Sequence, residues 1–495
     1  MGVNILANLF GRFWAIGVGL AFVPIYINLL GIESYGLIAF YSTLVTVMGI
    51  LDLGLTSTIN RELARSAAKA ADSARIPDLV RTLELIYWGI GGLLGIAVVL
   101  LAPFIGVRWL RADHVSKETL VSTVRLMGLV LALQWPASLY GGGLLGLQRQ
   151  VLLNGITSVT STLRFAGGAF MLWKVSRTTD TFFLWQAAAS GIATLTLAAA
   201  LWHQPELRGK AYVRWALLRE VGQYATGVAS ISVLSIILMQ ADKLILTKLV
   251  PLEAFAYYGL ASQVSSSISY VVSPIMAGIF PALCVATSEN DEMKLRSLFR
   301  DGAGLVGGTA IPIVVFVVFF ARDIVFAWQR NATTAERTGP ILVVLAGAAA
   351  FTAFYNMPYH LLLARGHTRT PILANIFSLA VLVPLLALSI PRLGVMGAAL
   401  SGLIVNALML CALPHSVFQG ELRNDKWSWL THDVIVPTLC ASVPLAAIRL
   451  VFLPFDRPVG ILSLGVCALI SCAAGLLSAA PTRRWVERHM GAIAR

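Results

Sequence analysis

Long apolar runs recur from one end of this sequence to the other, and they constrain the fold more than any other feature. The chain has 495 residues, of which 57% are hydrophobic and only 12% are charged. Soluble domains carry about 25% charged residues, so a water-soluble core could not absorb this much apolar surface. Each run is about 20 residues long, which is enough to cross a bilayer as a helix. The sequence therefore predicts an all-α polytopic membrane protein.

We predict fourteen transmembrane helices from these runs. They cover approximately residues 8–30, 37–57, 83–107, 122–145, 151–173, 181–202, 222–247, 256–284, 301–321, 340–363, 371–390, 394–416, 434–453 and 459–480. The connecting stretches are short, which argues against a separate soluble domain and against nucleic-acid binding. The formal net charge of +13 therefore indicates either basic cytoplasmic loops, as the positive-inside rule expects, or an anionic ligand.

The polar break between the first two runs repeats later in the chain. Residues 29–44 read LLGIESYGLIAFYSTL, and residues 249–264 read LVPLEAFAYYGLASQV, which is a shift of 220. The same shift places Gly146-Leu-Gln-Arg149 on Gly366-His-Thr-Arg369, again between two apolar runs. Two matches at one offset indicate an internal duplication, and such repeats bear directly on the fold.

The duplication predicts how the chain is divided. Each repeat holds six spans, an even number, so both copies enter the membrane in the same sense. Two six-helix lobes should then be related by a pseudo-two-fold axis along the membrane normal, with two extra C-terminal helices. The predicted parts are an N-lobe at 1–215, a C-lobe at 216–418, and spans 13 and 14 with a tail at 419–495. Lys and Arg are more frequent in the loops that become cytoplasmic if both termini are cytoplasmic, so we predict that orientation.

Arg164 is the most informative charged residue, because it lies near the middle of the fifth span. An ionisable side chain inside a membrane is costly to bury and therefore marks a functional site by default. The planar guanidinium also suits a pyrophosphate, which it can contact through two donors at once. We predict that Arg164 is a substrate ligand in a cavity; the alternative is an interhelical salt bridge.

Two further arginines are candidate cavity ligands. Arg12 lies about one turn into the first span, where snorkelling to the headgroups explains it equally well. Arg125 lies near the outer end of the fourth span, where interfacial anchoring is the alternative. The five cysteines have no metal-ligand spacing, so we predict packing roles for them and no metal site.

Four residues are candidates for gating or ion coupling. Asp242 and Lys243, near the outer end of the seventh span, could latch an outer gate or simply begin a loop. Asp52, in the inner half of the second span, could take up a proton or cap a helix end. His360, in the tenth span, could titrate near physiological pH, although a lone histidine is usually a hydrogen-bonded structural residue.

Several stretches resemble a known family. Residues 29–37, then LDLGL at 51–55 and NRELAR at 60–65, resemble the opening of the bacterial Wzx-type flippases of O-antigen or lipid-linked oligosaccharides. ADKLIL at 241–246, followed by LEAFAY at 252–257, resembles the seventh-helix signature of that family. The resemblance covers the first two spans and the seventh and eighth, and it is loose over the last hundred residues.

The resemblance implies a fold and a function. The fold is that of the multidrug/oligosaccharidyl-lipid/polysaccharide exporters, in which two lobes enclose a cavity and alternate between inward- and outward-open states. The implied substrate is an undecaprenyl-pyrophosphate-linked oligosaccharide, moved across the bacterial inner membrane for O-antigen or exopolysaccharide synthesis. Membrane lipids, a polysaccharide polymerase and a chain-length regulator are the implied partners. Many Wzx members have twelve spans, and extra terminal helices occur in the related lipid II flippases.

Two alternatives remain at this stage. An ion-coupled drug or metabolite antiporter would share the fold, but cationic drugs would favour carboxylates inside the membrane rather than Arg164. A membrane glycosyltransferase or polymerase should show a long periplasmic loop with catalytic residues, and the sequence has none. The chain also lacks the G-x-x-x-x-G-K-[ST] motif of ATP-driven pumps. We therefore predict no enzyme activity and no cofactor, with coupling to an H⁺ or Na⁺ gradient or to downstream removal of the product.

Overall fold

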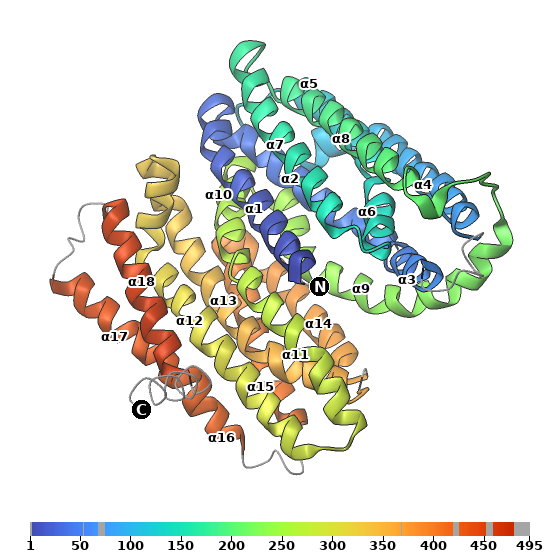
Figure 1. Ribbon diagram of the computed structural model, residues 1–495. Coiled ribbons are helices and arrows are strands. Elements are labelled where there is room, and N and C mark those ends of the chain that lie inside the picture. Colours follow the sequence, from blue (N-terminus) through green and yellow to red (C-terminus); the bar gives the residue numbers. More distant parts are fainter. Residues whose placement is uncertain are drawn as a thin grey trace. The chain divides into compact units, whose positions relative to one another are not determined.

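The computed structural model describes residues 2–52, 54–67, 75–367, 369–418, 425–451 and 459–479 of the chain. Within these ranges it describes the side chains of all residues except 2–10, 12, 218–232, 413–416 and 425. Every element of secondary structure in this part of the chain is helical (Figure 1). The prediction of an all-α protein is thereby confirmed.

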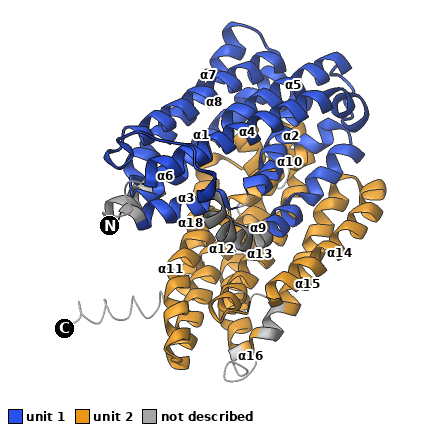
Figure 2. Ribbon diagram, turned by 90° about the vertical axis from the view of Figure 1, so that its right-hand side faces the viewer, with its two compact units in different colours: residues 1–256 blue, residues 257–495 orange. Residues whose placement is uncertain are grey.

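The chain divides into two compact units, Met1–Ala256 and Tyr257–Arg495 (Figure 2). The helices that begin in the first unit are α1 (Gly2–Leu30), α2 (Ile32–Met48), η1 (Gly49–Asp52), α3 (Leu55–Ala67), α4 (Ile76–Phe104), η3 (Ile105–Trp109), α5 (Lys117–Gln134), α6 (Ala137–Gly146), α7 (Gln150–Lys174), α8 (Thr179–Trp202), η4 (Pro205–Leu207), α9 (Trp215–Leu249) and α10 (Leu252–Ser266). The predicted lobe boundaries at 215 and 418 and the pseudo-two-fold axis stay predictions.

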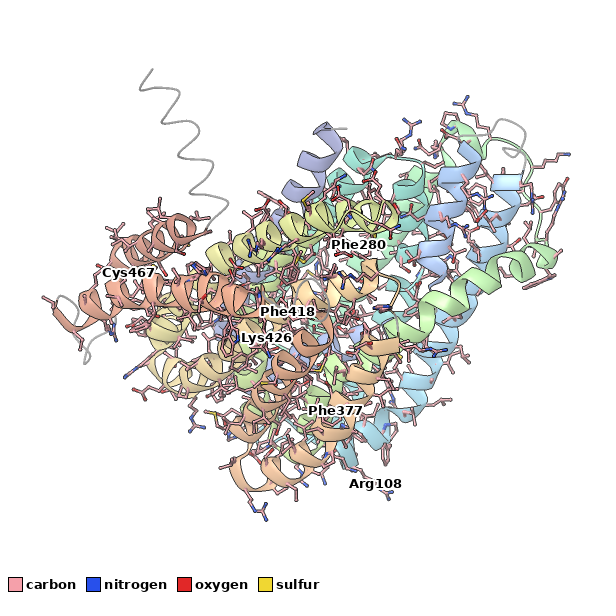
Figure 3. All side chains as sticks on the ribbon, turned by 90° about the horizontal axis from the view of Figure 1, so that it is seen from below. Arg108, Phe280, Phe377, Phe418, Lys426 and Cys467 are labelled. Atoms are coloured by element: carbon pink, nitrogen blue, oxygen red, sulfur yellow. The ribbon has the colours of Figure 1, made fainter. Side chains whose placement is uncertain are left out.

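The second unit continues from within α10. Its further helices are α11 (Ser269–Ser288), α12 (Glu292–Gln329), α13 (Ala332–Ala364), α14 (Arg369–Leu393), α15 (Val395–Val417), α16 (Asp425–Trp429), η6 (Leu430–Ile435), α17 (Val436–Val451) and α18 (Ile461–Ser478). Near the ends of α15 and α16, Phe418, which Figure 3 labels, stacks with Phe299 and Trp429 at ring-centroid distances of 5.7 and 5.5 Å.

Twelve helices in the described part of the chain are long and apolar enough to cross a membrane. Two more long helices, α7 and α9, occupy the fifth and seventh predicted spans. At 1.5 Å per residue, the 25 residues of α7 extend about 37 Å, which exceeds the hydrocarbon core of about 30 Å. The fourteen predicted spans therefore all correspond to helices, and the protein is a multi-pass membrane protein.

Some predicted spans consist of two elements. The fourth span breaks at Trp135 and Pro136 between α5 and α6, because proline cannot donate to the helical hydrogen-bond ladder. The eighth span is α10 followed by α11, with Ser267 and Ile268 between them. The second span begins at Ile32, five residues before its predicted start, so the polar turn at Gly31 is shorter than expected.

The two units repeat the same pattern of helix neighbours. In the first unit α4 packs on α5, α5 on α8, and α7 on α8. In the second unit α12 packs on α13, α13 on α15, and α14 on α15. These are the same three pairings in the same order along the chain, which is what an internal duplication would produce.

The two helices beyond the repeat pack closely on α12. A Cβ atom on Gly307 would clash with the carbonyl oxygen of Asp433 in η6, just before α17, and one on Gly475 of α18 would clash with Pro312. Ser471 donates its hydroxyl to the Pro312 carbonyl oxygen at 2.9 Å. Small residues allow this close approach of helix backbones in a membrane. Helices α17 and α18 are therefore an integral part of the second unit.

Candidate functional site

Helix α7 is unusually polar for a membrane span, yet most of its polar groups are satisfied within the helix. The hydroxyls of Thr157, Thr160 and Thr162 each donate to the carbonyl oxygen four residues earlier, at 2.8–2.9 Å. Such bonds let hydroxyls face lipid or other helices without a further partner. Arg164 differs, because its guanidinium bonds to side chains of neighbouring helices.

Arg164 is held by three uncharged acceptors. Its Nε donates to Gln186 Oε1 at 2.6 Å, and its Nη2 donates to Gln134 Oε1 at 2.6 Å and to Ser190 Oγ at 2.8 Å. Tyr41 also donates its hydroxyl to Gln134 Oε1, at 2.7 Å. Four helices of the first unit thus meet around one cation.

The sequence positions these groups through helix geometry. Gln186 and Ser190 are four residues apart on α8 and therefore lie on the same face, which packs on α5 and α7. Gln134 is the last residue of α5, where the helix breaks before Pro136. Both α8 side chains are at least 96% buried. The guanidinium is thus fixed against a preformed polar surface.

The backbone beside Arg164 is fixed as well. Tyr26 of α1 donates its hydroxyl to the carbonyl oxygen of Phe165 at 2.7 Å. The indole of Trp185 donates to the carbonyl oxygen of Arg164 at 3.2 Å. Because α7 is restrained from two sides at this level, Arg164 has little freedom to move away from its partners.

Among the described residues Arg164 forms no interhelical salt bridge, which was the alternative to a ligand role. In the described part of the chain its hydrogen-bond partners are all neutral, and no carboxylate pairs with it. Arg164 is half-buried on α7, and a cation withdrawn from water usually pairs with an acid or meets a ligand. Uncompensated positive charge at this depth can attract an anion, and the role of Arg164 as a substrate ligand stays a prediction.

Of the other two predicted cavity ligands, the structure describes the side chain of Arg125 alone, and Arg125 does not join this cluster. The side chain of Arg12 lies outside the described residues. Arg125 is exposed on α5. Their predicted roles in substrate binding stay predictions.

The predicted gating and coupling residues have local partners. Asp52 accepts the backbone N–H of Thr56 at 3.3 Å and its hydroxyl at 2.6 Å, so it caps the first turn of α3. Tyr87 also donates to Asp52, at 2.6 Å. The Nδ1 atom of His360 lies 2.8 Å from the carbonyl oxygen of Asn356, an ordinary structural bond within α13. Proton uptake by Asp52 or His360 stays a prediction.

Asp242 and Lys243 are both half-buried on α9. They lie eight and seven residues before Val250, where the helix has ended. Their assignment to an outer gate stays a prediction. In the described part of the chain no group of three or more His, Cys, Asp or Glu side chains could hold a metal ion.

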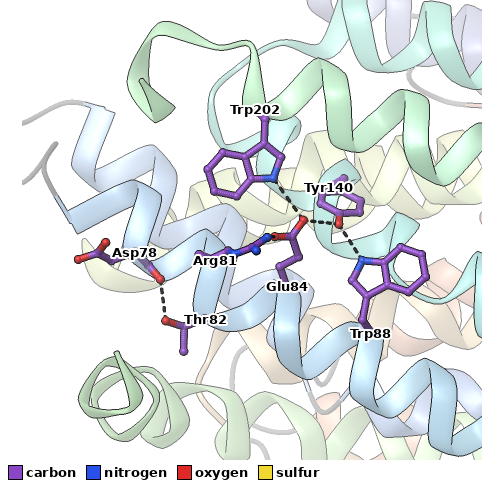
Figure 4. Close-up of polar contacts among 7 residues, drawn as sticks. All are labelled: Asp78, Arg81, Thr82, Glu84, Trp88, Tyr140 and Trp202. Atoms are coloured by element: carbon purple, nitrogen blue, oxygen red, sulfur yellow. Dashed lines mark hydrogen bonds and ion pairs between the residues drawn. The ribbon is translucent and has the colours of Figure 1, made fainter. Parts of the chain in front are cut away.

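One polar cluster that the sequence analysis missed lies at the start of α4 (Figure 4). Glu84 accepts bonds from Tyr140 at 2.6 Å and Trp202 at 3.3 Å, and it pairs with Arg81 at 2.6 Å. Glu84 lies at the predicted boundary of the third span, where a charged residue is expected, so the sequence alone does not mark it as part of a site. Its spacing of three from Arg81 was a signal, since such pairs share a helix face.

In the same region Asp78 binds the segment that leads into α9. It pairs with Arg214 Nε at 2.7 Å and accepts the backbone N–H of Tyr212 at 2.7 Å. Thr82 accepts the backbone N–H of Arg214 at 2.9 Å. The chain between α8 and α9 is thus attached to α4 over a stretch of three residues.

A second missed cluster lies at the predicted outer end of the first unit. Glu33 is only 6% exposed and accepts the backbone N–H groups of Asp113 and His114 at 2.5 and 2.9 Å. In the same loop, the carbonyl oxygen of Arg111 accepts the backbone N–H of Leu252 at 2.7 Å. A Cβ atom on Gly36 would lie 2.5 Å from the Leu252 carbonyl oxygen. The two turns that repeat in the sequence therefore contact each other.

An apolar groove of about 580 Å³ runs between α17 and α18 of the second unit. Its lining includes Val436, Leu439 and Val443 of α17 and Ala474 and Leu477 of α18. Leu439, Val443 and Leu477 are exposed.

Comparisons with known proteins agree with the fold. The family model described as polysaccharide biosynthesis protein matches residues 1–285, and the MatE model matches residues 228–388. A protein of Shigella flexneri assigned as an O-antigen transporter is 19% identical over 418 residues, covering 82% of this chain and 96% of that protein.

Solved structures of transporters share the architecture. The lipid II flippase MurJ in an inward closed conformation superimposes with a TM-score of 0.71 at 16% identity, covering 98% of this chain and all of that chain. An inward-facing multidrug resistance MATE transporter gives a TM-score of 0.70 at 13% identity, covering 86% of this chain and 99% of that one. Since the polysaccharide model matches more than half of the sequence, the chain belongs to the polysaccharide biosynthesis protein family of Wzx-type transporters, within the exporter superfamily that includes the MATE proteins, and it is not an enzyme.

Proposed function

We propose that the protein flips an undecaprenyl-pyrophosphate-linked oligosaccharide from the cytoplasmic to the periplasmic leaflet of a bacterial inner membrane. The observation that carries this proposal is Arg164, a cation on the predicted fifth span whose described hydrogen-bond partners are all neutral. A lipid-linked pyrophosphate is anionic and must cross the same low-dielectric region. Arginine offers it two parallel donors.

The apolar groove on the extra helices supports the lipid half of this substrate. A prenyl carrier needs a hydrocarbon surface for its chain, and the α17–α18 groove of the second unit offers one. The headgroup would move through the protein while the chain stays in contact with apolar side chains. The O-antigen assignment of the Shigella flexneri relative fits a sugar-bearing head.

The orientation and the energy source are part of the proposal. Both termini would be cytoplasmic, as the distribution of Lys and Arg predicts. The driving force would be an H⁺ or Na⁺ gradient or the consumption of the flipped product by a polymerase. Association with that polymerase and with a chain-length regulator stays a prediction.

Depletion of the protein in its native host tests the proposal. We expect an undecaprenyl-pyrophosphate oligosaccharide to accumulate on the cytoplasmic leaflet and the surface polysaccharide to be lost. Extraction of the lipid-linked intermediates, followed by mass spectrometry, would identify the sugar, and a leaflet-specific label would locate it. Re-expression of the wild-type chain should reverse both effects.

The drug-antiporter alternative rests on the MatE match at residues 228–388. It predicts a different outcome of the same depletion: no trapped lipid intermediate, and greater sensitivity to small cationic toxins. That result would overturn the flippase proposal.

A further inference from the structure

We propose that Gln134, Gln186 and Ser190 are positioning residues that keep the charge of Arg164 uncompensated and aim its free donors at an anionic headgroup. The inference rests on the proposed function, because it concerns the same site. It adds a specific claim about the neutral acceptors: they are amides and a hydroxyl because carboxylates would neutralise the site.

The acceptors take up some of the N–H donors of the guanidinium and leave others available. Arginine has five N–H donors in a fixed plane. The single donor of Nε goes to Gln186, and the two donors of Nη2 go to Gln134 and Ser190. Tyr41 is a further neutral partner, through a hydrogen bond between its hydroxyl and the guanidinium. The bonds to Gln134, Gln186 and Ser190 do not use the Nη1 donors, which are therefore the ones that a phosphate oxygen can take.

A purely structural role would favour acids at the same positions. Glutamate has the shape of glutamine and could accept the same bond from Arg164 Nε while adding an ion pair. The Nε2 group of Gln186 makes no hydrogen bond to any described residue, so its replacement by oxygen removes no donor that the fold uses. Breaking or unbalancing a buried charge is costly, and pairing it is the usual solution. In the described part of the chain, no acid is paired with Arg164 in this way.

The internal repeat provides a comparison within the same chain. A shift of 220 places Gln186 on Asn406 of α15, which also accepts from a neighbouring helix. Asn406 Oδ1 accepts the hydroxyls of Thr352 and Tyr355 of α13, both at 3.1 Å. The same shift places Arg164 on Pro384. The two amides have different partners, since Gln186 accepts from α7 and Asn406 accepts from α13, and the positive charge is present in the first copy alone at these positions.

The test compares Gln186→Glu with Gln186→Leu in the full-length chain. Two quantities are measured: the melting temperature of the purified protein in detergent, and restoration of surface polysaccharide in cells depleted of the wild-type protein. We expect Gln186→Glu to raise the melting temperature by about 2–4 °C, as one new favourable interaction does in a large domain, and to lower polysaccharide export at least about tenfold, as the loss of one charged contact does. Gln186→Leu should lower both.

A matched control isolates the arginine. Asn406→Asp makes the same amide-to-acid change where no arginine is present at the matching repeat position, and it should not raise the melting temperature. The inference is overturned if Gln186→Glu is stabilised and still exports normally, since the free charge would then be unnecessary. It is also overturned if Gln186→Glu is not stabilised. Neither result touches the flippase proposal, which depends on whether depletion traps a lipid-linked intermediate.

Discussion

The variant Arg164→Ala should lose transport by about a hundredfold or more while its expression stays unchanged. The two free donors of Arg164 would make charge-assisted hydrogen bonds, which contribute about 1.5–3 kcal/mol each, and about 1.4 kcal/mol corresponds to a factor of ten. The neutral partners Gln134 and Gln186 leave no unpaired acid behind when the arginine is removed. The measurement is the surface polysaccharide of depleted cells that carry the variant, normalised to the amount of protein in the membrane.

Arg164→Lys is the matched control. Lysine keeps the positive charge but loses the planar fork, so it cannot hold Gln134, Gln186 and a phosphate at the same time. We expect it to lose part of the activity, about tenfold, which lies between the wild type and the alanine variant. Full activity of Arg164→Ala would remove this residue from the substrate path and with it the main support for the proposed function.

The largest effect on stability should come from Arg449→Leu in α17. Arg449 lies 3.1 Å from Asp323 of α12, and the two side chains are only 13% and 4% exposed. Asp323 also accepts the backbone N–H of Val459 at 2.9 Å. Removing one partner of a buried ion pair leaves an uncompensated charge and costs about 3–5 kcal/mol. The melting temperature in detergent should fall sharply, and the yield of folded protein with it.

A neighbouring ion pair that is exposed serves as a control, because it shows whether burial rather than charge alone determines the loss of stability. Arg322 and Glu336 lie 2.7 Å apart, but their side chains are more than half exposed. Exposed pairs contribute about 0–1 kcal/mol, so Arg322→Leu should leave the melting temperature almost unchanged. The double variant Asp323→Asn with Arg449→Leu should recover most of the loss, because the asparagine oxygen can still accept from Val459. Equal effects of the two single Arg→Leu variants would contradict the argument.

The spans and the main site candidate were predictable because they depend on local sequence. A run of apolar residues must cross the membrane as a helix, whatever its neighbours are, so all fourteen predicted spans correspond to helices. Arg164 was predictable for the same reason, since a charge within a span stands out without any knowledge of contacts. The division of α5 from α6 followed the proline at 136.

The partners of the charged residues were not predictable, because they are distant in the sequence. Gln134 and Gln186 are 30 and 22 residues from Arg164 in the sequence. Because they are uncharged amides, nothing in the sequence distinguishes them from other polar residues on a helix face. Glu33 lies in the repeated turn and starts a helix, but its carboxylate accepts from a loop 80 residues away. Asp323 fell in a predicted loop, and its arginine is in a helix beyond the internal repeat. Such pairings are decided only when the helices have packed.

The contact between the two repeated turns has a consequence for the transport cycle. The loop after η3 is joined to both turns through bonds that involve a charged group. Glu33 accepts two backbone N–H groups of the loop, while Arg111 of the loop donates its guanidinium to the Leu249 carbonyl oxygen at 3.3 Å and accepts the backbone N–H of Leu252 at 2.7 Å. Bonds to charged groups are roughly twice as strong as neutral ones. Separating the two turns would require breaking charged bonds on one side or the other, so we expect the loop to keep the two duplicated turns together throughout the transport cycle.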